Sequence, residues 1–239
     1  PAPPCTVETL KQRPAGDKSW PVACSHTTLG ESGKELDLSG AHLSYGDFKE
    51  ATFTGTGAIK LDEAGLAYAD LSGSELTVDS SSYGATIDFS GANLAHADLS
   101  GSELTAEGGV YGAIGFYGAN LAHADLSGTN LTAEGEGKGG GIDFYSANLA
   151  NADLSGSKLT AKSSYGDATI DFTEAALANA DLSDSALTAI GAFDATIDFT
   201  AADLTNVDLS GSVITADSSY GEATIDFSEA NLADSDLSG

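Results

Sequence analysis

A repeat of 27 or 28 residues that runs from Leu61 to the end of this 239-residue chain constrains the fold more than any other feature. Every copy carries a similar acidic segment, and the first three copies are AYADLSGSEL, AHADLSGSEL and AHADLSGTNL. The aspartate of this segment recurs as Asp70, Asp98, Asp125, Asp153, Asp181, Asp208 and Asp236. Self-similarity at such a period predicts a solenoid, in which each repeat forms one coil that stacks on the next. Stacked coils would align the seven carboxylates in one file.

Within each repeat, a large apolar residue recurs at every fifth position, as in Leu61, Leu66, Leu71 and Leu76. A period of five fits neither a helix nor a simple strand. It suits a chain that turns a corner after each short extended segment and points one large side chain inward per side. A small residue two positions earlier leaves room for each corner to close. Four such sides make one coil, and we expect the coils to stack at the strand spacing of about 4.8 Å.

One corner of each coil from Leu76 onward carries an insertion, because eleven or twelve residues rather than four separate the large apolar positions there. Thr and Ile flank a Gly/Ser/Tyr turn, as in LTVDSSSYGATIDF, so each insertion is either a small hairpin or an extended side strand. We expect the insertions to widen this corner and to form a ridge down one edge of the molecule. The aromatic residues of the predicted ridge are Tyr83, Tyr111, Tyr165, Phe193 and Tyr220.

The segments ANLAHADLSGSEL and ANLANADLSGSKL follow the pattern A-(D/N)-L-x-x and resemble the pentapeptide-repeat family. The resemblance covers residues 38–239 and recurs in every coil. It implies an all-β fold, namely a right-handed quadrilateral parallel β-helix with the Leu/Phe and Ala/Ser columns inside. We therefore predict a β-solenoid of about seven to eight coils, with a hairpin-like insertion at one corner of most coils. The resemblance implies less about activity, because the family spans gyrase-binding DNA mimics and many members of unknown role.

Residues 1–35 lack the five-residue period and contain all five prolines, Trp20 and the only two cysteines, Cys5 and Cys24. Two cysteines that bracket a short Pro-rich loop predict a disulfide formed in an oxidising compartment, with two unpaired buried thiols as the alternative. We predict that residues 1–35 form an N-terminal cap with this disulfide and that residues 36–239 form the pentapeptide-repeat β-helix.

The start of the chain also bears on its compartment. The chain begins with Pro and contains no Met, as expected of an exported protein whose signal peptide has been removed, although a trimmed chain would look the same. Together with the cysteine pair, this predicts an extracytoplasmic protein, secreted or on the cell surface, with the periplasm and the thylakoid lumen as alternatives. No apolar run approaches 18 residues, so we expect no membrane span.

The charge of the chain is strongly acidic and unevenly placed. The formal net charge is −27, and from Leu61 onward 29 acidic residues face only Lys138, Lys158 and Lys162. Such a surface repels nucleic acid and anionic lipid and attracts cations or basic partners. We therefore expect no direct binding of nucleic acid.

The seven aspartates of the repeated segment are the predicted metal ligands. Carboxylates about 5 Å apart repel by about 0.8 kcal/mol in water, so bound cations, hydrogen bonds or partial protonation must offset the repulsion. Ca²⁺ is the natural candidate, because it prefers carboxylate and carbonyl oxygens, but no EF-hand loop occurs and binding would be weak and spread over many sites. The competing interpretation is that Asp simply caps the corner. A second, interrupted file consists of Asp88, Asp143, Asp171, Asp198 and Asp226.

Two other columns suggest function less strongly. His96 and His123 fall in one column of adjacent coils, but two imidazoles make a poor metal site, so we interpret them as surface residues. A threonine column suggests ice binding, yet the second column that a flat face would need is broken at Ala113 and Gly141. The members of the first column are Thr77, Thr105, Thr132, Thr160, Thr188 and Thr215. No nucleophile elbow, HExxH, P-loop or dinucleotide fingerprint occurs, and we predict that the protein is not an enzyme.

These observations combine into a prediction of function. We predict a non-enzymatic, exported scaffold whose Asp files bind cations such as Ca²⁺, a mineral or cationic surface, or a basic protein partner, with no required cofactor. The chain ends at Gly239 inside a coil, and we expect either a longer chain or self-association through this uncapped coil. The alternative is a DNA mimic that binds a nucleic-acid enzyme such as gyrase, although the cysteine pair and the insertions fit it poorly. An ice-binding solenoid is the third hypothesis.

Overall fold

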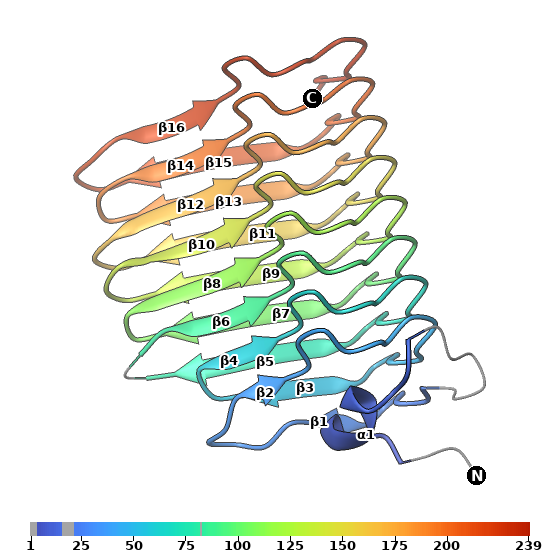
Figure 1. Ribbon diagram of the computed structural model, residues 1–239. Helices are drawn as coiled ribbons and strands as arrows, with labels where there is room; N and C mark the ends of the chain where they lie inside the picture. The colour runs from blue at the N-terminus through green and yellow to red at the C-terminus, as the bar shows by residue number, and fades with distance from the viewer. Residues whose placement is uncertain (1–3, 16–21, 82) are drawn as a thin grey trace.

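The strands of this chain stack into two parallel sheets that face each other across an apolar interior (Figure 1). The computed structural model describes residues 4–15, 22–81 and 83–239. The first sheet has the order β1-β3-β5-β7-β9-β11-β13-β15, and the second has the order β16-β14-β12-β10-β8-β6-β4-β2. The strands of the first sheet are β1 (Thr28–Leu29), β3 (Thr52–Gly55), β5 (Glu75–Ser80), β7 (Glu103–Gly108), β9 (Asn130–Gly135), β11 (Lys158–Ser163), β13 (Ala186–Gly191) and β15 (Val213–Ser218). The strands of the second are β2 (Leu36–Asp37), β4 (Ala58–Lys60), β6 (Ala85–Asp88), β8 (Tyr111–Gly115), β10 (Gly139–Asp143), β12 (Asp167–Asp171), β14 (Ala195–Asp198) and β16 (Ala223–Asp226).

The two remaining sides of each coil are held by single-residue parallel bridges. One file of bridges joins the aspartates of the repeated segment, as in Asp98 to Asp125, and the other joins residues such as Asn93 and Asn120. Two sheets and two bridge files give a coil with four sides. The right-handed quadrilateral β-helix predicted from the sequence is confirmed.

Three corners of each coil are tight turns that place one residue in the left-handed region. In one of them the N–H of Ala97 donates to the C=O of Leu94 at 2.9 Å, and His96 between them has a φ of 58°. A bond between residues three apart with positive φ at the third position defines a type II turn. Gly91 and Gly101 occupy the same position at the other two corners of this coil, with φ values of 65° and 62°. The second x of the five-residue pattern is therefore a constrained position.

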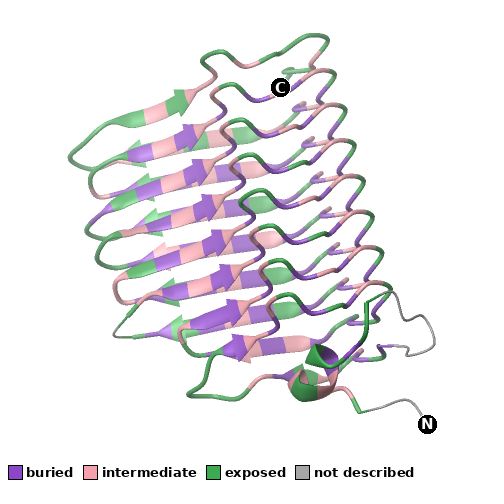
Figure 2. Ribbon diagram, in the orientation of Figure 1, coloured by how far each residue is buried: buried purple, intermediate pink, exposed green. Residues whose placement is uncertain are grey.

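The interior is built from columns of identical side chains. Neighbouring phenylalanine rings are parallel to within 2°, with centroids 4.7 to 5.0 Å apart along the column. The members of this phenylalanine column are Phe89, Phe116, Phe144, Phe172, Phe199 and Phe227. All but Phe227 are fully buried, and buried leucines such as Leu94, Leu99 and Leu104 fill the other three inward columns. Figure 2 shows buried positions recurring along both sheets. Offset or stacked rings add to the free energy gained by burying their apolar area.

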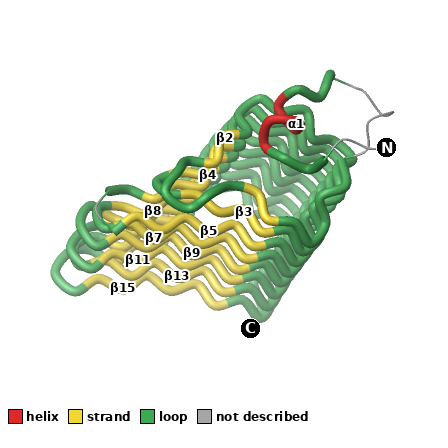
Figure 3. The backbone as a smooth tube through the Cα atoms, turned by 90° about the horizontal axis from the view of Figure 1, so that it is seen from below, coloured by secondary structure: helices red, strands yellow, loops and turns green. Residues whose placement is uncertain are grey.

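The insertions are extended side strands. The two strands of one insertion, such as β5 and β6, belong to different sheets, and each pairs in parallel with its counterparts in the neighbouring coils. The turn of each insertion is hairpin-like, as predicted, but the two strands that it joins form their hydrogen bonds with neighbouring coils and not with each other. Both sheets consequently run out from the body of the coil to one edge, where the turns join them (Figure 3).

Side-chain size explains why the two sheets converge at this edge. The inward residues of β7 shrink from Leu104 through Ala106 to Gly108 toward the turn. A Cβ at Gly108 would lie 2.0 Å from the carbonyl oxygen of Tyr111, so the two strands are too close there for a side chain. Other coils use glycine or a small, buried serine such as Ser80 at this level. The wider corner that the sequence predicts is thus a wedge that narrows outward.

A short helix covers the first coils. α1 (Val7–Lys11) begins at Thr6, whose side chain accepts a hydrogen bond from the N–H of Thr9 in a capping box. Cys5 and Cys24 form the predicted disulfide, with their Cα atoms 5.5 Å apart. Trp20 lies outside the described residues. No helix among the described residues is long and apolar enough to cross a membrane.

The side chain of Arg13 ties this segment to the coil. Arg13 is 7% exposed, and its Nη1 donates to the carbonyl oxygens of His42 and Ser44 at 2.8 and 2.9 Å. Leu10 and Cys24 pack into the same core as the repeats. Buried carbonyls need partners, so a guanidinium suits the start of the stack. The division into a cap at residues 1–35 and a β-helix at 36–239 stays a prediction.

Candidate interaction surfaces

The aspartates of the repeated segment form a continuous column, which we call the Asp ladder. Its members, from Asp70 to Asp236, are those identified from the repeat, and each is bridged in register to the next. Oδ1 of Asp98 accepts hydrogen bonds from the backbone N–H of Ser100 at 2.9 Å and from its hydroxyl at 2.6 Å. The same pair of bonds recurs at Asp125, Asp153 and Asp181. Each carboxylate therefore caps the turn that follows it.

These hydrogen bonds also offset part of the repulsion within the ladder. The hydroxyl and the N–H of Ser210 lower the pKa of Asp208, because they stabilise its charged form. Every hydrogen bond that the described residues make to the ladder is accepted by Oδ1. Within the described parts of the chain, no group of three or more His, Cys, Asp or Glu is arranged to hold a metal ion. Binding of Ca²⁺ by the seven aspartates stays a prediction.

The second file of aspartates lies at the ends of the strands of the second sheet. Asp143, Asp171 and Asp198 occupy three consecutive strands in register, while Gly115 interrupts the column between Asp88 and Asp143. Burial raises the pKa of Asp143, the N–H of Tyr145 lowers it, and the nearby charges of Asp171 and Asp88 raise it further. Asp143 is therefore a carboxylate whose charge costs free energy in the folded state.

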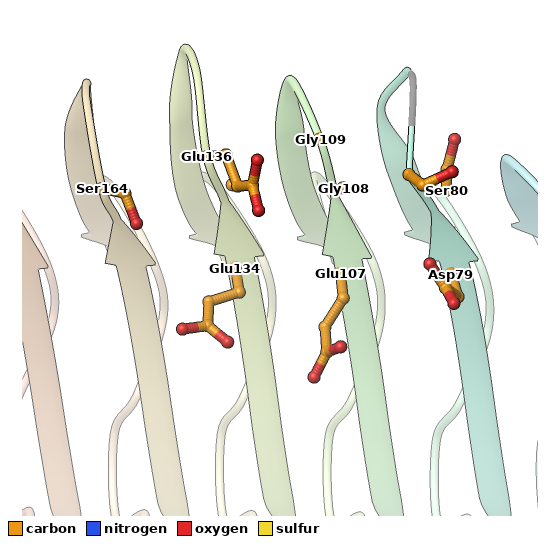
Figure 4. Close-up of a pocket in the computed structure, with 10 residues that line it drawn as sticks. Asp79, Ser80, Glu107, Gly108, Gly109, Glu134, Glu136 and Ser164 are labelled. Carbon is orange, nitrogen blue, oxygen red and sulfur yellow. The ribbon is translucent and has the colours of Figure 1, made fainter.

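An acidic groove of about 300 Å³ lies along the outer edge of the first sheet, close to the turns of the wedge (Figure 4). Asp79, Glu107 and Glu134 pair in register on three adjacent strands and line it together with Glu136. Its floor includes the glycines that the narrowing of the wedge requires. Lys162, the next residue of the column, forms an ion pair with Glu134 and ends the acidic run. This groove was not predicted from the sequence, although acidic residues at one register of successive insertions were the available signal.

The aromatic ridge follows the turns of the wedge, as the insertions predicted. Tyr83, Tyr111, Tyr165, Phe193 and Tyr220 are all exposed. Lys138 occupies the turn between β9 and β10, so the ridge is divided into a shorter N-terminal and a longer C-terminal part.

A second aromatic column consists of rings that stack on one another. Tyr45, Tyr68, His96 and His123 stack face to face at a turn, with ring centroids 4.6 to 5.0 Å apart. The inner rings, Tyr68 and His96, are therefore stacked on both faces. The predicted column of His96 and His123 exists, and it continues a stack of two tyrosines, Tyr45 and Tyr68.

Two further predicted features have defined positions. The threonine column lies on the outer face of the first sheet in unbroken register from Thr77 to Thr215. On the second sheet, Ala113 and Gly141 break the corresponding column. The last coil exposes Val213 and Leu237, which are 60% and 59% accessible, and self-association through this end stays a prediction.

The fold and these surfaces define a class: an acidic parallel β-solenoid with carboxylates in register on its outside. A sequence model described as pentapeptide repeats, with eight copies, matches residues 87–106 and 116–133. The chain therefore contains pentapeptide repeats, and their five-residue pattern recurs in every coil. No curated protein sequence matches the chain.

Three solved structures illustrate how far this likeness extends. QnrB1, a plasmid-mediated fluoroquinolone resistance protein, is 18% identical, with a TM-score of 0.27 and coverage of 86% of this chain and 90% of that chain. HetL, involved in heterocyst differentiation regulation in the cyanobacterium Nostoc sp. strain PCC 7120, is 19% identical, with a TM-score of 0.23 and coverage of 93% and 90%. A pentapeptide repeat protein from the Arabidopsis thaliana thylakoid lumen is 20% identical, with a TM-score of 0.12 and coverage of 77% and 69%. Likenesses this distant carry no argument about function.

Proposed function

We propose that this protein is a non-enzymatic, extracytoplasmic scaffold that binds a basic protein partner along the Asp ladder. The observation that carries the proposal is the unbroken file of outward carboxylates on a surface where 29 acidic residues face three lysines from Leu61 onward. Such a field attracts cationic partners from a distance and disfavours anionic ones. A rigid stack holds the charges at fixed spacing, so the partner meets a preorganised surface.

The arrangement of the carboxylates favours binding over catalysis. General acid–base chemistry uses two carboxyl groups with different pKa values that converge on a substrate. Here the aspartates repeat in one environment, coil after coil, and each uses Oδ1 to cap its own turn. The Oδ2 atoms, which the caps do not use, can accept hydrogen bonds from lysine or arginine.

Replacement of ladder aspartates by asparagine tests this proposal without disturbing the turns. Asn93 caps its turn by accepting the N–H of Ala95 through Oδ1 at 3.2 Å, so asparagine can serve where aspartate does. We expect Asp98→Asn, Asp125→Asn, Asp153→Asn and Asp181→Asn, combined, to weaken the binding of a fluorescent oligolysine peptide strongly. The matched control neutralises Asp88, Asp171, Asp198 and Asp226 of the second file. Equal weakening by both sets would contradict a role for the ladder, and no binding by the unaltered protein would contradict the scaffold itself.

Calcium is a second candidate ligand of the same ladder, because Oδ2 atoms recur at every coil and Ca²⁺ takes several carboxylate oxygens. A thermal melt with millimolar CaCl₂ tests it against NaCl of equal ionic strength. We expect a higher melting temperature with Ca²⁺, and a shift that the quadruple ladder variant lacks. Equal melting temperatures in both salts would exclude specific Ca²⁺ binding.

A DNA mimic is the alternative function, and the charge density favours it. With coils about 4.8 Å apart, the repeats carry roughly one net charge per 1.2 Å of axis, compared with one per 1.7 Å of double-stranded DNA. A partner of this kind would be a DNA-binding enzyme such as gyrase. Inhibition of gyrase supercoiling would support this alternative, and unimpaired supercoiling at a molar excess of the protein would exclude gyrase. The broken second threonine column gives no comparable support for ice binding.

A further inference from the structure

The C-terminal part of the aromatic ridge has no structural task that accounts for its exposure. Tyr165, Phe193 and Tyr220 sit at the turns of three consecutive coils and are 73%, 54% and 84% exposed. The equivalent turn between β9 and β10 carries Glu136, Gly137 and Lys138 and closes without an aromatic residue. Exposed large apolar side chains gathered in one place mark binding surfaces.

The backbone beneath these rings is fixed by hydrogen bonds between coils. The N–H of Phe193 donates to the carbonyl oxygen of Gly166 at 3.3 Å, and the N–H of Tyr220 donates to that of Ala192 at 3.0 Å. None of the stacked ring pairs found among the described residues involves these three side chains, in contrast to the stack that contains Tyr68. These side chains are therefore exposed and unstacked, on turns that are already ordered.

Each of the three aromatic residues is followed, one or two positions later, by an acidic residue at or next to the start of a strand of the second sheet. Oδ1 of Asp167 accepts the N–H of Asp194 at 3.1 Å, and Oδ1 of Asp194 accepts the N–H of Glu222 at 3.0 Å. These bonds hold the side chains of Asp167 and Asp194 in place, and all three acidic residues are exposed. Three consecutive coils thus present exposed aromatic and acidic side chains one or two residues apart in the chain.

We propose that Tyr165, Phe193 and Tyr220, with Asp167, Asp194 and Glu222, form a docking surface for an arginine-containing, extended segment of a basic protein. A guanidinium stacks on an aromatic face and also binds a carboxylate through two parallel hydrogen bonds, whereas the ammonium of lysine forms neither contact as well. Neighbouring coils repeat both groups, so several arginines of one segment can bind at once. This inference rests on the proposed binding of a basic partner and adds its preferred residue and its place on the fold.

The test compares two fluorescent peptides of equal charge, one alternating arginine with serine and one alternating lysine with serine, at physiological ionic strength. We expect the arginine peptide to bind about tenfold more tightly, which corresponds to about 1.4 kcal/mol. Combined Tyr165→Ser, Phe193→Ser and Tyr220→Ser should abolish this preference. The control variant carries Tyr45→Ser, Tyr68→Ser and Tyr117→Ser, which alter exposed aromatic residues elsewhere, and should keep it.

The outcomes separate this inference from the proposed function. Equal affinity for the two peptides, or loss of the preference in the control variant as well, would overturn the docking surface. If both peptides bind equally and the quadruple ladder variant binds neither, the scaffold proposal stands and the ridge has no part in it. If neither peptide binds the unaltered protein, both proposals are wrong. Circular dichroism of each variant confirms that the coils remain intact.

Discussion

The phenylalanine column offers the sharpest test of how this fold is held together. Phe144 lies in the middle of the column, with Phe116 at 4.7 Å and Phe172 at 4.8 Å on either side of its ring. Phe227 lies in the last coil, is only half-buried, and has one stacked neighbour, Phe199, at 4.8 Å. The same substitution at Phe144 and at Phe227 therefore removes different amounts of packing.

We expect Phe144→Ala to lower the free energy of unfolding by about 4 kcal/mol, within the range found for buried phenylalanine. Loss of two stacking contacts of about 0.5–1.5 kcal/mol each contributes to this cost. Phe227→Ala should cost about 2 kcal/mol or less, since one contact and part of the buried area are lost. Phe144→Leu should cost about 1–3 kcal/mol, because leucine refills most of the volume, as it does in the other three columns, and only the ring contacts disappear.

Urea unfolding followed by far-ultraviolet circular dichroism gives these free energies, and hydrogen exchange locates the effect. In Phe144→Ala the amides of β8, β10 and β12 should exchange faster than those of β2 and β4, because each coil of a solenoid contacts only its neighbours. Equal losses at Phe144 and Phe227 would refute the reasoning. So would a Phe144→Leu variant as unstable as Phe144→Ala, because volume would then not matter.

Three further predictions concern charge and backbone. Asp143→Asn should raise the melting temperature at neutral pH, because burial raises the pKa of Asp143 and the folded state therefore favours the neutral form. This increase should disappear below the ordinary pKa of aspartate, where the carboxyl group is protonated in both states. An increase that becomes larger in acid would contradict the prediction. The ammonium of Lys11, 2.8 Å from Asp37, and the N–H of Ser39 lower the pKa of Asp37 from 3.8 to about 2. The stabilisation from Asp37 is therefore present above 3.8 and is lost as the pH falls toward 2, so Lys11→Ala should lower stability at neutral pH by up to about 1 kcal/mol and have no effect at the acid end of a series of melts. Ala201→Gly should raise the free energy of unfolding by about 0.5 kcal/mol, because Ala201 has a φ of 57°, a left-handed conformation that glycine adopts more easily. Ala202→Gly, at the buried neighbouring position, should lower the free energy of unfolding by about 1 kcal/mol. Equal effects of the two substitutions in urea unfolding would contradict the turn geometry.

The regular part of the fold was predictable because one rule repeats. A large residue at every fifth position and a small one two positions before it dictate both the inward columns and the corners. The register follows as well, since only one alignment places leucine on leucine and phenylalanine on phenylalanine in successive coils. The sequence alone therefore predicted the coil, its four sides and its core.

The insertions show where sequence reasoning stops. Their Thr, Gly and Ile pattern fits both a hairpin and a pair of side strands, because the local turn is the same in the two arrangements. The choice depends on whether each strand bonds to its partner in the insertion or to the coils above and below, which is a long-range property. Identical registers along both sheets decide it, since Thr105 then continues the ladder of Thr77 and Thr132.

Of the candidate surfaces, the Asp ladder could be predicted from the repeat and the acidic groove could not. The Asp ladder was evident because it repeats with the coil. The groove lined by Asp79, Glu107 and Glu134 depends on three insertions whose sequences differ, and the acidic run ends where Lys162 forms an ion pair with Glu134 on the neighbouring strand. Pairings of this kind lie outside the repeat rule, so the sequence alone did not single them out.

The choice of aspartate over asparagine in the ladder needs an explanation other than the fold. Asparagine caps the neighbouring corner through the same atom, as Asn120 does when it accepts the N–H of Ala122 at 3.2 Å. Aspartate adds repulsion of about 0.8 kcal/mol in water from each neighbouring coil. Since capping alone does not require the charge, the basic partner that we propose would account for the unbroken file of aspartates.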